Sequence, residues 1–414
     1  MIWVGVKSER FRRIKEEVKS IVLNRLDLTQ ETDDSVIEEM IEEEIIKKSR
    51  TESIDLAEKL VLWKEIFNSI RRLDVLQELV EDKSVTEVMI NGPDHIFIEQ
   101  EGRIREWNKQ FESKEKLEDV IQQIVSASNR MVNEANPIVD VRLQDGSRVN
   151  VVLYPIALEG PVVTIRKFPE KPIDIAQLLQ FGSITEEAAD FLKKLVVAKY
   201  NIFISGGTGS GKTTFLNALS NFIPSDERII TIEDSAELQI KNIPNLVRLE
   251  TRNANVEGKN AISIRDLIKS SLRMRPDRIV VGEIRDGAAI DMLSAMNTGH
   301  DGSLSTGHAN STEDMLSRLE TLVLMGMDLP LPAVRRQIAS AIDIIVHLGR
   351  LRDKTRKVLE IVEVLDCEDG EIRTNPLYQF VEEGEKDGKV IGSLKRTGHT
   401  MKHTEKLERA GIDI

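Results

Sequence analysis

GGTGSGKTT, residues 206–214, decides the fold of this chain. Its first eight residues match the pattern G-x-x-x-x-G-K-[ST], in which glycines let backbone N–H groups turn inward around a phosphate. The apolar stretch NIFIS (201–205) precedes it, and the helical pattern TTFLNALSNF (213–222) follows it. A strand, a glycine-rich turn and a helix are the required context, because the helix N-terminus adds its positive dipole. The sequence therefore predicts a phosphate-binding loop.

The ligand contacts are expected from this loop and from two side chains at its end. Lys212 is placed to reach the β- and γ-phosphates of a nucleotide, and the Thr213 hydroxyl to coordinate Mg²⁺. ATP and Mg²⁺ are therefore the expected ligand and cofactor. The remaining predicted contacts are Gly206, Gly207, Thr208, Gly209, Ser210, Gly211 and Thr214.

Acidic residues follow two further apolar strands. RIITI (228–232) ends in Glu233 and Asp234, and RIVVG (278–282) is followed by Glu283. Because ligands lie beyond the carboxyl ends of the strands in an open parallel sheet, all three acids are expected near the γ-phosphate. Glu233 and Glu283 are the catalytic candidates, and Glu283 and Asp234 are metal-ligand candidates.

Gly282 stands where a strand of this kind usually ends in a metal-binding Asp. We interpret this glycine as the mark of a distinct type of site, in which two strand ends share the carboxylate roles. Which of Glu233 and Glu283 positions the attacking water is left open.

Two histidines flank a short predicted strand in TGHDGSLSTGHANS (298–311). A histidine just past a strand end can donate a hydrogen bond to a phosphate oxygen. His308 is the candidate for sensing the γ-phosphate, whereas a structural and a functional role both stay open for His300.

The overall composition limits the classes of function. The chain has 414 residues, 31% of them charged, and a formal net charge of −13. This acidic balance argues against direct nucleic-acid binding. Cys367 is the only cysteine, which excludes an intrachain disulfide and fits a reducing compartment. No apolar run approaches the ~18 residues of a membrane-spanning helix, so we expect a soluble cytoplasmic protein that meets membranes through partners.

The order of strand-like and helix-like patterns along the chain predicts several domains and segments. Apolar strands alternate with helices from Tyr200 onward, which favours a doubly wound α/β domain covered on both faces of its sheet. Before it, alternating strands around Asn91-Gly92 and Asp145-Gly146 predict a small α+β domain. The acidic stretch 31–44 is expected to be a solvated helical face or a mobile lead-in. The expected parts are a charged helical segment (1–68), the α+β domain (69–168), a linker (169–185), the phosphate-loop domain (186–381) and a C-terminal tail (382–414).

Four motifs in this order resemble those of the secretion ATPases that drive type II secretion, type IV pili and type IV secretion. They are GGTGSGKTT, the acidic TIEDSAEL, the atypical RPDRIVVGEIRD and the histidine-containing TGHDGSLSTGHANS. VTEVMINGPDHIFIE, DVRLQDGSRVNVV and VVTIRKF also resemble the CpaF/TadA group, which assembles tight-adherence (Flp) pili. The resemblance covers roughly residues 70–380.

The resemblance implies a RecA-like ATPase domain preceded by a PAS-like domain, in a homo-hexameric ring. It places the nucleotide between the two domains, in contact with arginines of the first. Arg148 and Arg166 are the candidates, because they lie close to the linker in chain order. It also implies that Glu233 orients water, that Glu283 acts on the metal side and that His308 is the histidine of the fourth motif.

The resulting hypothesis is a Mg²⁺-dependent ATPase at the inner face of the cell membrane. It would power pilus, pseudopilus or secretion machinery through an inner-membrane platform protein. One alternative is a DNA-transfer or nucleic-acid motor, which DNA-stimulated hydrolysis would reveal. The other is a nucleotide-dependent scaffold, which would show negligible phosphate release.

Overall fold

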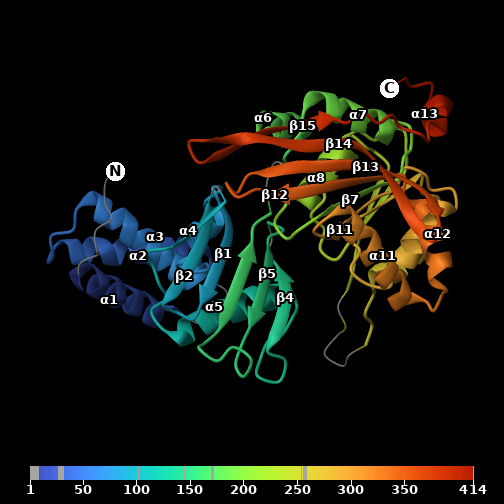
Figure 1. Ribbon diagram of the computed structural model, residues 1–414. Coiled ribbons are helices and arrows are strands. Elements are labelled where there is room, and N and C mark those ends of the chain that lie inside the picture. The colour runs from blue at the N-terminus through green and yellow to red at the C-terminus, as the bar shows by residue number, and fades with distance from the viewer. Residues whose placement is uncertain are drawn as a thin grey trace. The chain divides into compact units, whose positions relative to one another are not determined.

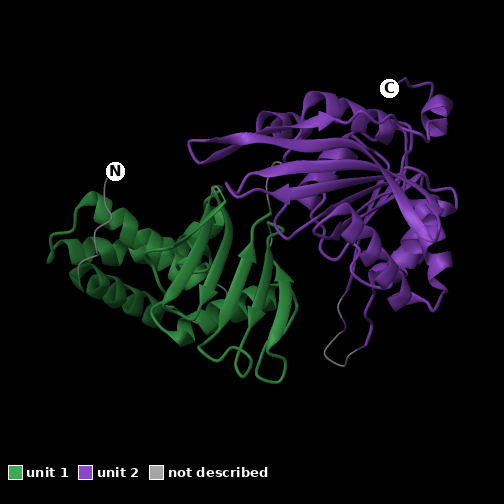
Figure 2. Ribbon diagram, in the orientation of Figure 1, with its two compact units in different colours: residues 1–169 green, residues 170–414 purple. Residues whose placement is uncertain are grey.

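The computed structural model contains two compact units, residues 1–169 and 170–414 (Figure 2). It describes residues 9–26, 32–100, 102–143, 145–168, 172–252, 254 and 259–413. Each unit has its own sheet and its own hydrophobic core, which is the organisation of separate domains.

Unit 1 begins with three helices that pack as a bundle (Figure 1). In the second helix, Ile37, Ile41 and Ile45 recur at helical spacing and are buried among the other two helices. The acidic segment expected as a solvated face therefore also carries a buried apolar stripe. The helices are α1 (Glu9–Arg25), α2 (Asp34–Ser49) and α3 (Leu56–Arg71).

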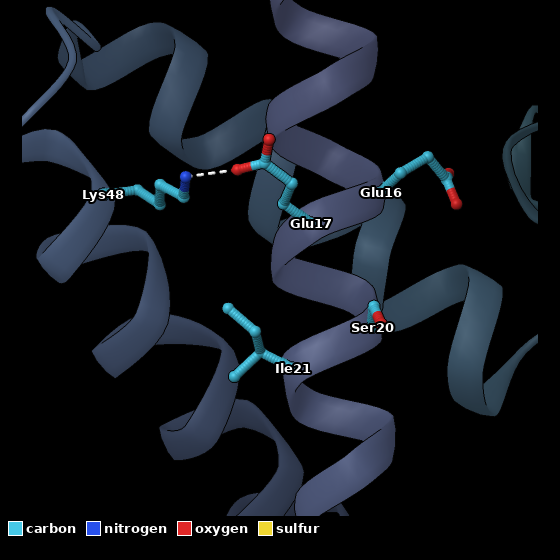
Figure 3. A pocket seen from close by; sticks show the side chains of 5 residues that line it. All are labelled: Glu16, Glu17, Ser20, Ile21 and Lys48. Carbon is cyan, nitrogen blue, oxygen red and sulfur yellow. Dashed lines mark hydrogen bonds and ion pairs between the residues drawn. The ribbon is translucent and has the colours of Figure 1, made fainter.

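An ion pair between Lys48 and Glu17 joins α2 to α1 and borders an open hollow on the bundle surface (Figure 3). Glu16, Ser20 and Ile21 complete its lining. None of the residues predicted to bind phosphate lies in this hollow, so the candidate site is elsewhere.

The rest of unit 1 is a six-stranded antiparallel sheet with strand order β3-β2-β1-β6-β5-β4. Apolar residues of α5, among them Leu117 and Ile121, pack with Val149 and Val163 of the sheet in one core. Residues that alternate with Val149 and Val163 lie on the opposite face. The elements are α4 (Leu76–Glu81), β1 (Val85–Asn91), β2 (His95–Gln100), β3 (Arg103–Glu106), α5 (Lys114–Ala127), β4 (Ile138–Arg142), β5 (Arg148–Val152) and β6 (Val162–Arg166).

Unit 2 is built on a nine-stranded sheet with strand order β15-β14-β13-β12-β7-β11-β10-β8-β9. The six strands from β12 to β9 in this order are parallel, and β13, β14 and β15 add an antiparallel extension. The strands are β7 (Ile202–Gly206), β8 (Ile229–Glu233), β9 (Leu246–Glu250), β10 (Arg278–Val281), β11 (Leu304–His308), β12 (Ile344–Arg350), β13 (Arg356–Glu368), β14 (Glu371–Lys386) and β15 (Lys389–Arg396).

Helices cover both faces of the parallel strands (Figure 1). Phe191 of α7 and Phe215 of α8 belong to one core, whereas Ile268 of α9, Leu293 of α10 and Leu319 of α11 belong to the other. The predicted RecA-like, doubly wound α/β class is confirmed. The helices are α6 (Ile175–Gln180), α7 (Glu186–Val197), α8 (Lys212–Ser220), α9 (Ile264–Ser271), α10 (Ala289–Asn297), α11 (Thr312–Gly326), α12 (Leu331–Ala341) and α13 (Glu405–Ala410).

Two segments are more ordered than the sequence suggested. The expected tail continues the sheet, since β14 extends to Lys386 and pairs with β15. Buried Glu363 accepts the N–H groups of Lys402 and His403, which holds the chain before α13. The expected linker contains α6, whose first turn has a capping box between Asp174 and Gln177.

No helix in the described part of the chain combines the length and the apolar character needed to cross a bilayer.

Candidate functional site

The carboxyl ends of four neighbouring parallel strands bring the predicted site residues to one edge of the sheet. Gly206, at the end of β7, is paired with His308, at the end of β11. Val281 of β10 is paired with Ile232 of β8, so Glu233, the last residue of β8, and Glu283, two residues past β10, lie at neighbouring strand ends. This edge is where an open parallel sheet binds ligands.

The phosphate loop has the backbone shape that its glycines predict. Gly211, directly before α8, has φ 94°, a left-handed conformation that glycine adopts without strain. A Cβ on Gly206 would lie 2.5 Å from Leu348 O and 2.6 Å from Ser210 Oγ, so a side chain does not fit there. The predicted Lys212, Thr213 and Thr214 form the first turn of α8, while Gly207, Thr208 and Gly209 make the turn before it.

Lys212 begins a chain of polar contacts that crosses the strand ends. Its Nζ donates to Gly206 O and Gly207 O, each at 3.0 Å, and lies 3.1 Å from His308 Nδ1. His308 Nε2 lies 2.8 Å from Glu283 Oε1. Arg285 Nη2 donates to Glu283 Oε2 at 2.6 Å. Three of the predicted catalytic residues therefore form one connected network.

The network assigns the tautomer of His308. A lysine ammonium has only donors, so His308 Nδ1 must accept from Lys212 and its proton sits on Nε2. His308 Nε2 lies 2.8 Å from Glu283 Oε1 as an ion-pair contact without hydrogen-bond geometry, because Oε1 has no hydrogen-bond partner in the described structure. Burial lowers the pKa of His308, although nearby Glu283 opposes this, and burial also lowers the pKa of Lys212. A neutral imidazole between Lys212 and Glu283 fits these directions.

Glu233 is the buried carboxylate of the site, with 3% of its surface exposed. The chain after β8 folds back so that the N–H groups of Glu237 and Leu238 donate to Glu233 Oε2 at 2.7 and 2.9 Å. Within the described residues, Glu233 Oε1 has no hydrogen-bond partner. Burial raises the pKa of Glu233 to about 7, against the opposing effect of the two N–H groups. This carboxylate can therefore exchange a proton near neutral pH.

The glycine at position 282 has a physical cause. A Cβ on Gly282 would lie 2.9 Å from Glu233 Cγ, closer than real Cβ contacts allow. The Glu233 side chain thus occupies the space that an Asp at position 282 would need. The glycine directly after β10 and the buried acid at the end of β8 are therefore linked by packing.

Asp234 and Thr213 were predicted as metal ligands together with Glu283. Asp234 is exposed, accepts from Thr251 Oγ1 at 3.4 Å and lies 3.9 Å from Arg285 Nη1. The described residues contain no group of three His, Cys, Asp or Glu side chains that could hold a metal ion by themselves. Mg²⁺ commonly takes only one or two protein ligands and completes its shell with phosphate oxygens and water.

The donor set fits a nucleotide with its magnesium ion. Ser210 Oγ and Glu233 Oε1 are buried polar atoms that lack partners in the described structure. Buried polar groups of this kind are normally satisfied, and a phosphate with its bound water would supply the missing donor and acceptor. The loop glycines leave backbone room for that ligand.

Arg148 and Arg166 lie in unit 1, on the sheet face opposite the core. Arg148 on β5 is paired with Arg166 on β6 and with Arg142 on β4, so three arginines stand side by side. Glu87 on β1 neighbours Arg166; burial raises the pKa of Glu87, while Arg166 acts to lower it. The row gathers positively charged side chains on one face of the sheet. Its predicted contact with the nucleotide stays a prediction.

Three further residues complete the account of the site. His300 lies away from the network, with Nδ1 3.2 Å from Ala295 O, which fits a structural role. Arg285 was not predicted as a site residue, although its place two residues after Glu283 was a usable signal. Arg356 contacts the phosphate loop through Gly209 O at 2.8 Å. No sequence motif marks Arg356, because its contact depends on the order of strands in the sheet.

Comparisons with known proteins show the family of the chain. Residues 71–410 match the family model described as type II/IV secretion system protein. The chain is 33% identical over 313 residues to the conjugal transfer protein TrbB of Rhizobium radiobacter, covering 75% of this chain and 93% of that protein. It is 32% identical over 333 residues to the type IV secretion system protein VirB11 of Bartonella quintana, covering 70% and 92%.

A solved structure supports the fold. The Yersinia pseudotuberculosis ATPase DotB aligns with a TM-score of 0.52 and 18% identity, covering 70% of this chain and 78% of that one. The family match spans most of the chain and includes every predicted catalytic residue. The chain therefore belongs to the type II/IV secretion system protein family, and with its phosphate loop and strand-end acids it is an ATPase of that family.

Proposed function

We propose that this chain is a Mg²⁺-dependent ATP-hydrolysing motor that powers assembly or transport by a pilus or secretion machine. The observation that carries the proposal is the pairing of a phosphate loop with Glu233. This buried carboxylate has a pKa of about 7 and one oxygen without a partner in the described structure. Hydrolysis needs such a group to orient water and to accept its proton.

Glu233 and Glu283 have different roles in this proposal. Glu283 Oε2 accepts from Arg285, and Glu283 Oε1, which has no hydrogen-bond partner in the described structure, lies 2.8 Å from His308 Nε2. Glu233 keeps Oε1 available. Glu233 therefore positions the attacking water, and Glu283 acts on the metal and phosphate side.

Lys212, His308 and Glu283 respond together to the phosphates. Lys212 is held by the carbonyls of Gly206 and Gly207 and by His308. Turning its ammonium toward the β- and γ-phosphates would release His308 Nδ1, and so change the environment of the ring whose Nε2 lies 2.8 Å from Glu283 Oε1. His308 thus reports the γ-phosphate to the acid beside it.

Mg²⁺, when bound, neutralises charge on the β- and γ-phosphate oxygens. Thr213, Glu283 and Asp234 are the residues that would hold it. Asp234 and Glu283 both lie beside Arg285, which keeps the two carboxylates on the same side of the strand ends.

The motor works as a homo-hexameric ring at the cytoplasmic face of the cell membrane, against an inner-membrane platform protein. Family membership supports this arrangement. The family resemblance also makes Arg148 and Arg166 of the first domain candidates to contact the nucleotide. The two residues lie side by side, Arg148 on β5 being paired with Arg166 on β6.

Two kinds of machine remain candidates. The segments that resemble the CpaF/TadA group favour assembly of a tight-adherence pilus. The relatives named for conjugal transfer favour a DNA-transfer system. The net charge of −13 argues against direct DNA contact in either case. Adding double-stranded DNA to the ATPase assay tests for a nucleic-acid motor. If the chain powers either machine without contacting DNA, we expect that DNA does not stimulate its ATP hydrolysis.

Phosphate release by the purified full chain tests the proposal. Lys212→Ala should lower kcat by at least ~100-fold, since it removes a charge that stabilises the transferring phosphoryl group. Lys193→Ala, at an exposed lysine of α7, is the matched control and should leave the rate unchanged. Parent-level hydrolysis by Lys212→Ala would exclude this site as the site of hydrolysis.

A further inference from the structure

The hairpin between β12 and β13 lies at the same sheet edge as the phosphate loop. Leu348, near the end of β12, is paired with Gly206 at the end of β7. Five of the eight residues 350–357, RLRDKTRK, are basic. The first residues of β13 are therefore neighbours of the phosphate loop, although about 150 residues of sequence separate them.

Arg356 braces the phosphate loop from outside. Its Nε donates to Gly209 O at 2.8 Å, and its Cδ lies 3.5 Å from the place a Cβ would take on Gly211. Because a peptide is planar and trans, fixing the Gly209 carbonyl also fixes the direction of the Ser210 N–H. Arg356 thereby controls the orientation of a peptide inside the loop.

The next two residues of β13 hold a different segment. Lys357 Nζ donates to Phe181 O at 3.2 Å and to Gly182 O at 2.6 Å, just past the end of α6. A cation is favoured there by the dipole of the helix. The backbone N–H of Val358 donates to Ser183 O at 2.8 Å. Residues 181–183 are thus attached to β13 by three hydrogen bonds.

We propose that Arg356 and Lys357 couple nucleotide binding at the phosphate loop to the α6 segment, residues 174–183. A shift of the Gly209 peptide pulls on Arg356, and the adjacent Lys357 transmits the shift to the carbonyls after α6. α6 is the first helix after the end of unit 1. Nucleotide binding at the phosphate loop is therefore coupled to the first helix of unit 2.

This inference rests on the proposed function only in requiring that ATP or ADP binds the phosphate loop. Hydrogen exchange of the full chain, measured with and without saturating ADP, tests it. In the parent, ADP should slow amide exchange in residues 206–214 and also in 174–183. The second effect should be about tenfold, the scale of one charged hydrogen bond.

Two variants separate the two ends of the link. Lys357→Gln should keep the ADP-dependent protection of residues 206–214 and lose that of 174–183, and Lys357→Arg should restore it. Arg356→Gln should raise KM for ATP by about tenfold with little change in kcat, because it acts through the loop and not on the reacting atoms. Arg352→Gln is the control, since Arg352 lies in the same hairpin but pairs with Glu382 and Glu385.

The outcomes are distinct. A parent chain that shows no protection at residues 206–214 contradicts the nucleotide assignment itself. A parent chain that protects 206–214 but not 174–183 overturns the coupling alone. So does a folded Lys357→Gln variant that protects both segments as the parent does. An Arg352→Gln variant that loses protection at 174–183 would overturn the assignment of the link to Arg356 and Lys357.

Discussion

Charged side chains are buried at both edges of the nine-stranded sheet, but their hydrogen bonding differs. At the amino-terminal edge of the parallel strands, fully buried Arg278 donates to both oxygens of Glu227, at 2.5 and 2.8 Å, and to Val196 O. At the carboxyl edge, Glu233 is almost as deeply buried, yet one of its oxygens lacks a partner among the described residues.

The difference separates structural charges from chemical ones. A buried ion stabilises a fold only when its partners replace the lost water. Arg278 meets this condition, and the pKa of Glu233, raised to about 7 by burial, is the result of not meeting it. The ion pair at the amino-terminal edge has a structural role, and the carboxylate at the carboxyl edge is in a state suited to proton transfer.

The largest expected effect comes from removing the carboxylate partner of Arg278 at the amino-terminal edge. Glu227→Ala leaves Arg278 buried without its carboxylate and should lower the free energy of unfolding by about 3–5 kcal/mol. Urea denaturation measures the loss, and the remaining folded protein should hydrolyse ATP at the parent kcat. Glu382→Ala is the control, because it removes a partner of exposed Arg352. Equal effects of the two variants would remove the distinction between the edges.

The second effect comes from replacing Glu233, the buried carboxylate at the carboxyl edge. Glu233→Gln removes the proton acceptor and should lower kcat by roughly 100-fold while leaving ATP binding intact. In the parent, kcat should rise with pH and level off above about pH 7, because Glu233 acts only when deprotonated. That acid limb should be absent in the variant. An unchanged pH profile would assign the base to another group.

A smaller effect tests the packing between β8 and β10. Gly282→Ala places a Cβ against Glu233 Cγ and should lower kcat by about tenfold, less than the ~100-fold that a ~1 Å misplacement of a catalytic group can cost. Gly299→Ala is the comparison, since a Cβ there meets no atom within 4 Å although its φ of 94° strains the backbone. If Gly282→Ala has parent activity, Glu233 does not need its present position.

Much of this site could be predicted from the sequence, because its signals are local. The phosphate loop is a contiguous motif, and the acids at 233 and 283 directly follow apolar strands. His308 follows a strand in the same way. Parallel strands necessarily bring their carboxyl ends to one edge, so these residues converge without knowledge of the strand order.

The rest depends on which strands are neighbours. The contact of Arg356 with Gly209 exists because β12 lies beside β7. The steric link between Gly282 and Glu233 exists because β10 lies beside β8. In α2, the many carboxylates led to the prediction of an exposed helix face, although Ile37, Ile41 and Ile45 form a buried stripe. Charge dominates composition there, while periodicity decides burial.

The smallest expected effect is a pH-dependent change in the free energy of unfolding, caused by the titration of Glu233. The pKa of Glu233 is raised from 4.5 to about 7 on folding, so the folded state binds the proton more tightly. Its contribution is complete below about pH 4.5 and is lost as the pH rises through about 7. The full loss corresponds to about 3 kcal/mol. Glu233→Gln lacks this dependence but buries an amide with an unpaired donor, at a cost of roughly 2 kcal/mol.

The variant should therefore be about 1 kcal/mol more stable than the parent at about pH 8, and less stable at about pH 5. Urea unfolding at both pH values measures the crossing. Parallel stability curves for the two proteins would mean that Glu233 titrates normally in the folded state. A crossing would show that the orphaned oxygen lowers the stability of the fold at the pH where hydrolysis requires it to be charged.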